Sequence, residues 1–433
     1  KNFNRLKKIF LILLVVAGFV ACSSDGLREN AVQEIIHQAQ QYDLNRRSFA
    51  EAVQIAQNSI NMLEEDKAMT RGIAPVRKLN LKDGVKAFCK ADTRSSEASS
   101  DNDTLLYVFN FENDEGFAIV SASRGTDGLL AVVEQGYCDP NIPSEIEGFE
   151  QFKEMAKEYV KRSLEQKEPE QLRIPEGPII EYKDSITYSF SQVGPYVTVR
   201  WGQTYPEGEF CPNGIAGCTN TAMAQIMSYY NYPTSISLTY DGSNTSQSLN
   251  WSNMKAHATG HALSSCSTSS THKMIGKLLR ELGQRNHSSY NSGSTSTYSQ
   301  TYAIPTFTNL GYTCGSWYDF TGFIVRNQLN NAHLILLKGS STSSGHNWVQ
   351  DGYKTRVKTI RKMGRTATSG WFYTGEVTTL TDYFMRFNWG WYGNCNGYFA
   401  EGVYDASQAF SYDTGVHTAT YSYSNVKYLS VYH

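Results

Sequence analysis

The sequence predicts an α+β protein of more than one domain, and three observations lead to this expectation. The chain has 433 residues, whereas one domain usually has about 100 to 200. Residues 1–190 hold 53 of the 80 charged side chains, and residues 191–433 hold 27. The front therefore has the composition of charged helices, whereas the back is rich in Ser, Thr, Gly, Asn and Tyr, which are typical of strands and loops.

Composition also limits the class of protein. Hydrophobic residues make up 40% of the chain and aromatic residues 13%, which predicts a globular fold with a large core. The formal net charge of −2 provides no general attraction for nucleic acid, so nucleic-acid binding is not expected. We expect three parts, namely a leader over residues 1–22, a small α+β domain with a linker over residues 23–185, and a larger domain over residues 186–433.

The first 22 residues are typical of an export signal. Lys and Arg side chains precede the apolar stretch 9–20, which is too short to span a bilayer comfortably. Cys22 follows as in bacterial lipoprotein signals, although Phe19 stands where such signals usually have Leu. Lipidation of Cys22 would tether the protein to the membrane of the cell envelope. The alternative is a plain secretory signal and an extracellular protein.

The eight cysteines contain no C-x-x-C pair, which excludes zinc-ribbon and thioredoxin-like motifs. An exported protein can form disulfides. If Cys22 is lipidated and one other thiol is reactive, six cysteines remain, and the sequence does not choose among their pairings.

The front of the chain predicts helices around a hairpin. Apolar side chains at helical spacing over residues 30–65 indicate a helix pair. The β-rich runs 105–111 and 117–122 are joined by a polar, Gly-containing turn and predict a hairpin. Residues 149–166 predict another helix, and residues 168–181, with three prolines, predict an exposed connector.

The back of the chain predicts a helix followed mainly by strands. Residues 219–230 carry an apolar stripe and indicate the strongest helix, and residues 272–282 indicate a second. Ser/Thr-rich loops are expected at residues 264–271 and 288–299. From residue 301 onward, alternating aromatic-rich runs separated by Gly turns predict a twisted antiparallel sheet.

Cys218 is the first candidate catalytic residue in this sequence. It directly precedes the predicted helix 219–230, where the partial positive charge of a helix N-terminus lowers the pKa of a thiol and favours the nucleophilic thiolate. Considered alone, a Cys here is more often a small core residue, or a disulfide partner of Cys211.

Two further stretches could complete a nucleophilic site. His346 lies in SGHNWVQDGY, and Asn388 precedes two tryptophans in FNWGWYGNCNGYF. A nucleophilic thiol needs a base such as His, and an Asn carbonyl can orient that base without adding charge. Taken singly, His346 is more often a satisfied strand residue, Asn388 a turn residue, and Trp389 a core residue.

Together these stretches resemble a known family. The order Cys, then His 128 residues later, then Asn another 42 residues on is that of papain-type thiol proteases. The stretches GCTNTAMAQIMSYYNYP, GHNWVQDGY and NWGWYGNCNGYF resemble the streptopain family of bacterial cysteine peptidases, in the papain clan. The resemblance is strong over residues 196–399, and YVFNF and GFAIVSA resemble the family's propeptide domain more loosely.

The resemblance implies a fold, an activity and a set of roles. The fold is a papain-like catalytic domain with a helical lobe and a twisted antiparallel sheet or barrel lobe, preceded by an α+β propeptide that blocks the cleft or disturbs His346. The activity is cysteine endopeptidase, made as a zymogen. Cys218 is the nucleophile, His346 the general base and acid, Asn388 the orienting residue, Gln203 an oxyanion-hole donor and Trp389 a shield over the His–Asn contact.

Substrates are expected to be proteins or peptides, and their subsites are open. The family implies a subsite for a bulky apolar side chain, and the loop 290–299 is a candidate wall, with Tyr290, Ser292, Gly293 and Ser294 as candidate contacts. The stretch between Tyr353 and Phe387 is longer than expected for the family, and residues 354–365 within it are basic. It is interpreted as a solvated hairpin, or else as a loop that borders the cleft and selects acidic substrates or docks an envelope partner.

No cofactor or metal is expected. His257 and His261 are four residues apart, but Ala258 stands where the H-E-x-x-H motif has its glutamate. Two alternatives to an enzyme stay open at this point. One is a catalytically silent surface-binding lipoprotein on the same fold, and the other is a structural envelope lipoprotein whose cysteines are all disulfide-bonded.

Overall fold

The computed structural model combines helices with a large, mainly antiparallel sheet, which confirms the expected mixture of element types. It describes residues 46–63, 77–80, 85–88, 104–140, 142–165, 181–257, 270–340, 345–365, 371–404, 409–411, 417–420 and 426–433. The expected signal, with Cys22, lies outside these ranges. Every element below belongs to the unit of residues 48–433. None of the described helices is long and apolar enough to cross a membrane.

The N-terminal region, residues 48–165, packs two helices on a small sheet. Ser48 and Glu51 form a capping box, in which each side chain accepts a hydrogen bond from the other residue's backbone N–H, so the first helix begins at Phe49. The expected hairpin is confirmed by the antiparallel pairing of its strands. The elements are α3 (Phe49–Ser59), β1 (Val85–Phe88), β2 (Thr104–Asn110), η3 (Glu112–Asp114), β3 (Phe117–Ser121), β4 (Leu129–Val133) and α5 (Glu147–Glu165).

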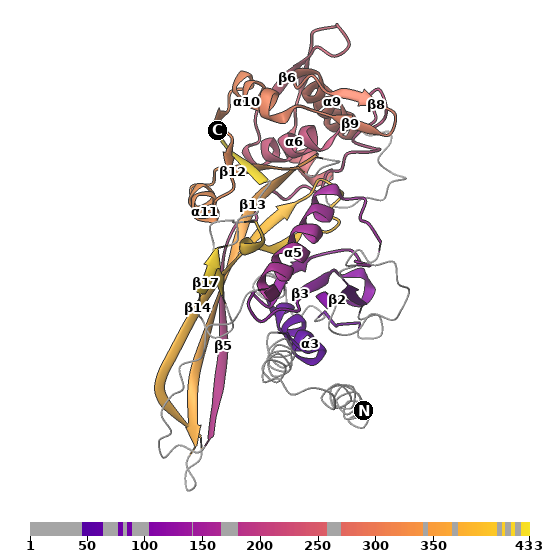
Figure 1. Cartoon of the computed structure of the whole chain (residues 1–433). Coiled ribbons are helices and arrows are strands. Elements are labelled where there is room, and N and C mark those ends of the chain that lie inside the picture. The colour runs from indigo at the N-terminus through magenta and orange to yellow at the C-terminus, as the bar shows by residue number, and fades with distance from the viewer. Residues whose placement is uncertain are drawn as a thin grey trace, which may run out of the picture. The chain divides into compact units, whose positions relative to one another are not determined.

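One sheet runs through both halves of the chain. Its order is β1-β2-β3-β4-β15-β14-β13-β12-β18-β10, and β4 pairs with β15 through Val133 and Gly397. The N-terminal region is therefore an extension of the sheet that carries the C-terminal strands (Figure 1). These strands are β10 (Thr313–Cys314), β11 (Tyr318–Asp319), β12 (Leu334–Ser340), β13 (Gly345–Arg365), β14 (Phe372–Asn388), β15 (Gly397–Ala400) and β18 (Val426–Tyr432). The short helix η4 (Glu401–Val403) follows β15, and β16 (Ala409–Ser411) and β17 (His417–Thr420) pair as a separate two-stranded sheet.

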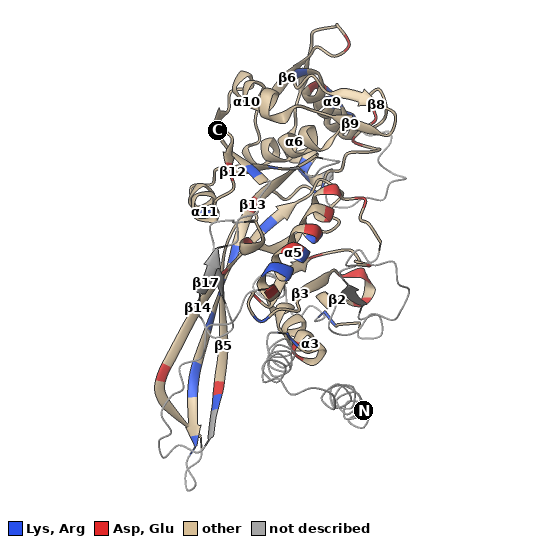
Figure 2. Cartoon of the chain, in the orientation of Figure 1, with Lys and Arg blue, Asp and Glu red and all other residues tan. Residues whose placement is uncertain are grey.

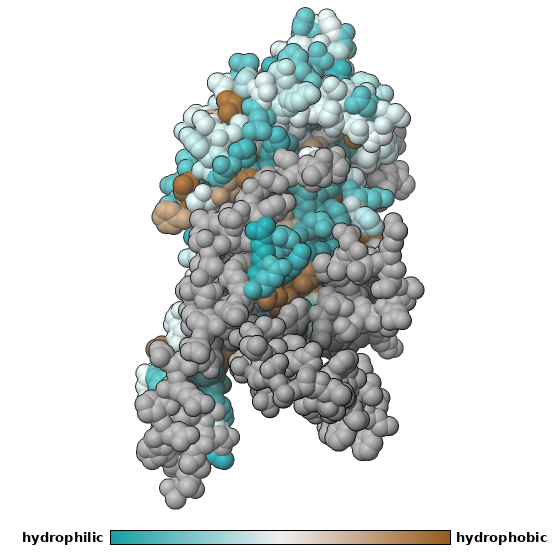
Figure 3. Space-filling model, viewed as in Figure 1, coloured by the Kyte–Doolittle hydropathy of each residue, from teal (hydrophilic) through white to brown (hydrophobic). Residues whose placement is uncertain are grey.

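Helices cover the C-terminal end of this sheet and enclose a second hydrophobic core. In Figure 3 this part presents mostly hydrophilic or neutral residues, with isolated hydrophobic patches. Its elements are α6 (Cys218–Tyr230), β6 (Ser235–Leu238), β7 (Thr245–Ser248), α7 (Trp251–His257), α9 (Ser270–Arg285), β8 (Ser289–Asn291), β9 (Ser294–Ser296), α10 (Ser299–Asn309) and α11 (Gly322–Asn330).

The expectation of strands from residue 301 onward is wrong for α10 and α11. Thr, Tyr and Phe have high strand propensity, but Ala303, Phe307 and Leu310 recur at helical spacing, and all three are buried. Tertiary packing of this apolar stripe outweighs the local preference, even with Pro305 inside α10.

Three long strands project from the body of the 48–433 unit (Figure 1). In this arm β5 (Glu181–Val193) pairs along its whole length with β13, which also pairs with β14. The expected division between residues 185 and 186 falls inside β5. The basic stretch 354–365 lies on the central strand, which leads away from His346 near its start, so the interpretation as a loop bordering the cleft is wrong.

Candidate active site

Cys218 is the first residue of α6, where the chain turns sharply into the helix. Gly217 has a φ of +88°, and a Cβ there would lie 2.9 Å from Thr295 Cγ2, so glycine suits both the backbone and the space. Behind Cys218, Ala222, Met223 and most of the helix are buried. The thiol is therefore held at the tip of a rigid helix that the core fixes in place.

The thiol of Cys218 contacts the imidazole of His346, which β13 brings beside the helix tip. Burial opposes ionisation of Cys218, but the charge of His346, a hydrogen bond with its ring and the backbone N–H of Asn347 hold the pKa of this thiol below its usual value. Burial also opposes ionisation of His346 and so lowers its pKa. The charge of Cys218, the hydrogen bond between Cys218 and the ring, and Glu147 outweigh burial and raise the pKa of His346 to about 9. The two groups favour a thiolate–imidazolium pair.

His346 is almost fully buried, and two adjacent tryptophan rings lie beside it. Its centroid is 6.1 Å from that of Trp348, which is nearly parallel, and 6.4 Å from that of Trp389. His346 Nε2 lies 3.2 Å from the backbone oxygen of Trp389, which fixes the ring plane. Trp389, which was expected to shield a His–Asn contact, thus lies beside the imidazole, and it is itself fully buried.

Asn388 lies next to this site but does not contact His346. Its amide donates to Val199 O at 2.9 Å, and its Oδ1 accepts from Gln225 Nε2 at 3.1 Å and from Gly390 N at 3.2 Å. These are its hydrogen bonds within the described residues, so the carbonyl of Trp389, and not Asn388, holds the imidazole here. Through its bond to Gly390 N, Asn388 ties together the backbone on the two sides of Trp389.

Gln203 lies in the loop that approaches Cys218 from the other side. Its backbone oxygen accepts a hydrogen bond from Ala216 N at 2.7 Å. This bond holds Gln203 beside the residue two positions before Cys218. Its side chain is 7% exposed, and no hydrogen bond of its amide occurs among the described residues. The amide therefore remains able to donate to an incoming oxygen.

The four candidate substrate contacts lie on the β8–β9 hairpin. Tyr290 is half-buried, and its hydroxyl hydrogen-bonds with the thiol of Cys211, so it has a structural role. Ser292, Gly293 and Ser294 are exposed at the turn. The sequence analysis missed Thr295, whose side chain lies over Gly217, because a Thr in a Ser/Thr-rich loop carries no distinguishing signal.

Residues of the N-terminal region also reach this site. Glu147 Oε2 lies 3.7 Å from His346 Nδ1. A Cβ on Gly148 would lie 2.5 Å from Trp389 Cζ3 and 2.6 Å from His346 Cδ2, so only glycine permits this close approach of α5. Sequence reasoning missed both residues, because nothing local marks the start of this helix as a contact with the imidazole.

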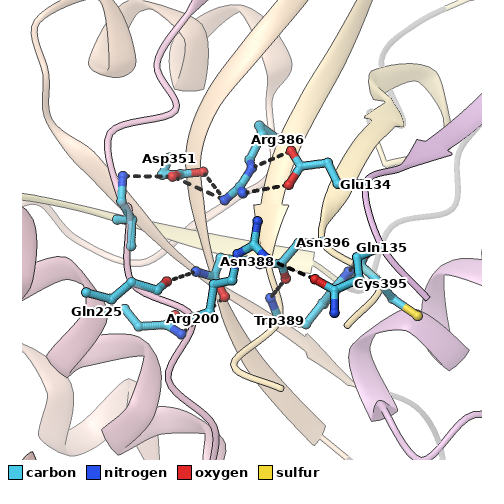
Figure 4. Close-up of polar contacts among 12 residues, drawn as sticks. Glu134, Gln135, Arg200, Gln225, Asp351, Arg386, Asn388, Trp389, Cys395 and Asn396 are labelled. Carbon is cyan, nitrogen blue, oxygen red and sulfur yellow. Dashed lines mark hydrogen bonds and ion pairs between the residues drawn. The ribbon is translucent and has the colours of Figure 1, made fainter. Parts of the chain in front are cut away.

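A buried ionic network joins the N-terminal region to the strands around the site (Figure 4). Arg386 pairs with Asp351 at 3.2 Å and with Glu134, at the end of β4, at 3.2 Å. Burial raises the pKa of Asp351, an effect that Arg386 only partly offsets. Removing one partner of such a network typically costs about 3 to 5 kcal/mol, because it leaves a buried charge unpaired.

The remaining cysteines and histidines form no second site among the described residues. Cys138, Cys211, Cys218, Cys314 and Cys395 are free thiols, so Cys218 is not a disulfide partner of Cys211. The part of the chain described here contains no group of three or more His, Cys, Asp and Glu able to hold a metal. His261, like the side chain of His257, lies outside the described residues.

The ionisation of Cys218 leads to a prediction about alkylation. At pH 7, iodoacetamide is expected to modify Cys218 at least about 100-fold faster than Cys314, because the thiolate is the reacting species. Cys314 is also partly exposed, but burial raises its pKa to about 12, which makes it a matched control. Peptide mapping by mass spectrometry measures both rates, and equal rates would contradict the ion pair.

Comparisons with known proteins agree with this geometry. Residues 199–399 match the model of the peptidase C10 family, and residues 40–160 match that of the Spi protease inhibitor. The region around Cys218 and His346 is therefore a domain of the cysteine-peptidase class. The chain thus contains a domain of the peptidase C10 family, which is streptopain-like, and a Spi inhibitor-like segment precedes that domain.

Two relatives illustrate the similarity. The chain is 24% identical over 347 residues to thiol protease/hemagglutinin PrtT of Porphyromonas gingivalis, which covers 70% of this chain and 34% of the relative. The chain thus spans about a third of the length of that relative. A fragment of Prevotella intermedia prointerpain A is 18% identical, with a TM-score of 0.48, over 82% of this chain and 98% of the fragment.

Proposed function

We propose that the chain is a cysteine endopeptidase that is made as a zymogen and hydrolyses proteins or peptides. The observation that carries the proposal is the contact of Cys218 with His346 at the start of a buried helix, inside a peptidase C10 domain. A thiolate beside an imidazolium is the activated form of a cysteine nucleophile. The alternative of a silent binding lipoprotein gains no support from the comparisons or from this arrangement.

The proposed reaction has two half-reactions. The thiolate of Cys218 attacks the scissile carbonyl carbon, and the resulting oxyanion accepts hydrogen bonds from the backbone N–H of Cys218 and the amide of Gln203. The intermediate collapses as His346 transfers its proton to the leaving amine, which gives a thioester. His346 then takes a proton from water, whose oxygen attacks the thioester and releases the acid and the free thiol.

Asn388 acts as a positioning residue in this proposal. Its bond to Gly390 N and its anchors on Val199 and Gln225 support the backbone that presents the Trp389 carbonyl to His346. The buried indole of Trp389 excludes water from that contact. Exposed residues at the β8–β9 turn, Ser292 to Ser294, border the approach to Cys218 and are the proposed contacts with substrate.

The N-terminal region is proposed to hold the enzyme latent. Glu147 and Gly148 pack against the general base, and β4 and Glu134 join the region to the peptidase domain. We further propose domains at residues 1–22, 23–185 and 186–433, and export through the N-terminal signal. Lipidation at Cys22 would leave the enzyme on the cell envelope, whereas a plain signal would release it.

Latency is tested by separating the two regions after folding. A recognition site for a foreign protease is placed between residues 165 and 181, so that cleavage interrupts none of the described elements. Casein hydrolysis is expected to rise at least about 10-fold after cleavage and removal of the N-terminal region, because the imidazole becomes accessible. Equal rates before and after removal would refute latency, and the same chain with Cys218→Ala controls for the added protease.

The proposed latency should also depend on pH. The folded pKa of His346, about 9, is above its ordinary value of 6.5. The stabilisation that the imidazolium gains from Cys218 and, to a smaller extent, from Glu147 is therefore complete below the ordinary pKa and is lost as the pH rises through about 9.

A further inference from the structure

The arm comprises residues 181–193, 353–365 and 371–384 and is not used by the proposed reaction. β13 and β5 keep a continuous antiparallel register from Tyr353 and Val193 at the base to Arg365 and Glu181 at the end, whereas the pairing of β13 with β14 shifts between Arg361 and Met363. Arg365 is nineteen residues beyond His346 on the same strand, which corresponds to roughly 60 Å of extended chain. The end of the arm is therefore remote from the thiol.

Positive charge is concentrated on the arm. Its residues include seven Lys and Arg against four Asp and Glu, although the whole chain has a net charge of −2. Figure 2 shows Lys and Arg positions recurring along β13 and at the end of the arm. Some of these charges are compensated, since Arg356 pairs with Asp382 at 2.6 Å near the base and Lys362 pairs with Glu376 at 3.4 Å nearer the end. Arg361 and Arg365, near the end, are exposed.

Aromatic side chains lie beside these cations at the end of the arm. Lys183 Nζ is 4.2 Å and the Arg365 guanidinium carbon 5.5 Å from the centroid of the Trp371 ring. Tyr373 is two residues from Trp371, so both lie on one face, and it is 48% exposed. Phe372, on the opposite face, is 38% exposed.

Aliphatic side chains extend this surface along the arm. Val377 is 53% exposed and Ile186 is 45% exposed, although both are β-branched apolar residues on a sheet. A sheet end that leaves aromatic and aliphatic groups in water beside several cations has the composition of an interaction surface rather than of a solvated hairpin.

We propose that the end of the arm binds an anionic lipid surface. Lys and Arg near a membrane are attracted by its negative headgroups, and Trp and Tyr favour the boundary between headgroups and hydrocarbon. A lipid surface meets both requirements at one place. A soluble polyanion would satisfy the cations but would leave Trp371, Phe372 and Tyr373 in water.

This placement has a consequence for the enzyme. With the end of the arm in the headgroup layer, the site at Cys218 would face solution at a distance set by the arm. The proposed contact does not require lipidation at Cys22 and does not depend on peptidase activity.

Vesicle binding tests the proposal. The purified chain from Ser23 onward is used, so that the apolar stretch 9–20 cannot itself bind lipid. Co-sedimentation with vesicles of phosphatidylcholine and phosphatidylglycerol is expected to give at least about 10-fold tighter binding than with phosphatidylcholine alone, and to weaken in 0.5 M NaCl. Replacing Trp371 and Tyr373 by Ser should weaken binding at least about 5-fold.

Matched controls separate the outcomes. Tyr298 and Phe323 are 77% and 64% exposed on the helical part, and replacing both by Ser should leave binding unchanged. Quenching of tryptophan fluorescence by brominated lipid should be reduced in Trp371→Phe, a change that preserves an aromatic ring. Equal binding to both kinds of vesicle would overturn the proposal. The proposal would also be overturned if dextran sulfate bound as tightly as the vesicles and the Ser replacements did not weaken that binding. This result would indicate a site for a soluble polyanion.

Discussion

Replacing Cys218 by Ala is expected to lower kcat/KM for peptide hydrolysis at least about 10⁴-fold, to the level of the remaining binding and oxyanion contacts. The reason is covalent: no other group at the tip of α6 can form the thioester, because Thr219, the next residue, is buried and its hydroxyl donates to Asn347 Oδ1 at 3.0 Å. Initial rates on a fluorogenic peptide, with reductant present, measure the loss. The form freed of the N-terminal region should be used.

Cys314→Ala is the matched control for this change. Cys314 is also a partly exposed free thiol, but its pKa is raised and it lies on β10, so its removal should leave the rate within about twofold. Hydrolysis that survives Cys218→Ala would reject Cys218 as the nucleophile, provided that circular dichroism shows both variants folded.

Replacing Gly148 by Leu is expected to release latency in the uncleaved chain. The added side chain cannot fit between α5 and the rings of Trp389 and His346, where even a Cβ would be 2.5 Å from the nearest atom. Overpacking of this kind costs about 1 to 3 kcal/mol, which corresponds to a rise of roughly 5- to 150-fold in the undocked population. Casein hydrolysis by the uncleaved chain should rise in proportion.

Glu154→Leu provides the comparison on the same helix. The Glu154 side chain is 63% exposed and lies about two turns further along α5 than Glu147, so this change adds an apolar residue without crowding the imidazole. After cleavage and removal of the N-terminal region, the Gly148→Leu and parent enzymes should have equal rates. A Gly148→Leu chain that stays as latent as the parent would show that α5 does not control access to His346.

The site residues that could be predicted from sequence are those next to a segment with helical or strand periodicity. Cys218 at the start of an apolar helix and His346 before an alternating strand could each be found, because helix and strand periodicity place them. The contact between them follows from the family resemblance, since no local rule relates residues 128 positions apart. The orientation of Asn388 away from His346 depends on Val199 and Gln225, which are equally remote.

The fold was less predictable where distant strands or packing decide the local structure. The predicted division between residues 185 and 186 follows a proline-containing connector, yet residues 181–193 form the continuous strand β5, because β13 offers a complete row of backbone partners. Residues 299–309 have strand propensity but form α10, because Phe307 and Ala303 pack on the second core. The contact of Gly148 with His346 arises only when β4 and β15 join the two regions into one sheet.

Direct capture of the acyl-enzyme tests the central claim that Cys218 becomes covalently bonded to substrate. The enzyme, freed of its N-terminal region, is mixed with a slowly hydrolysed peptide ester, quenched in acid and mapped by mass spectrometry. The account predicts the acyl mass on the peptide that contains Cys218, and its release by hydroxylamine. Turnover of the ester with the acyl group on another residue, or with no acylated peptide under conditions where it should accumulate, would contradict it.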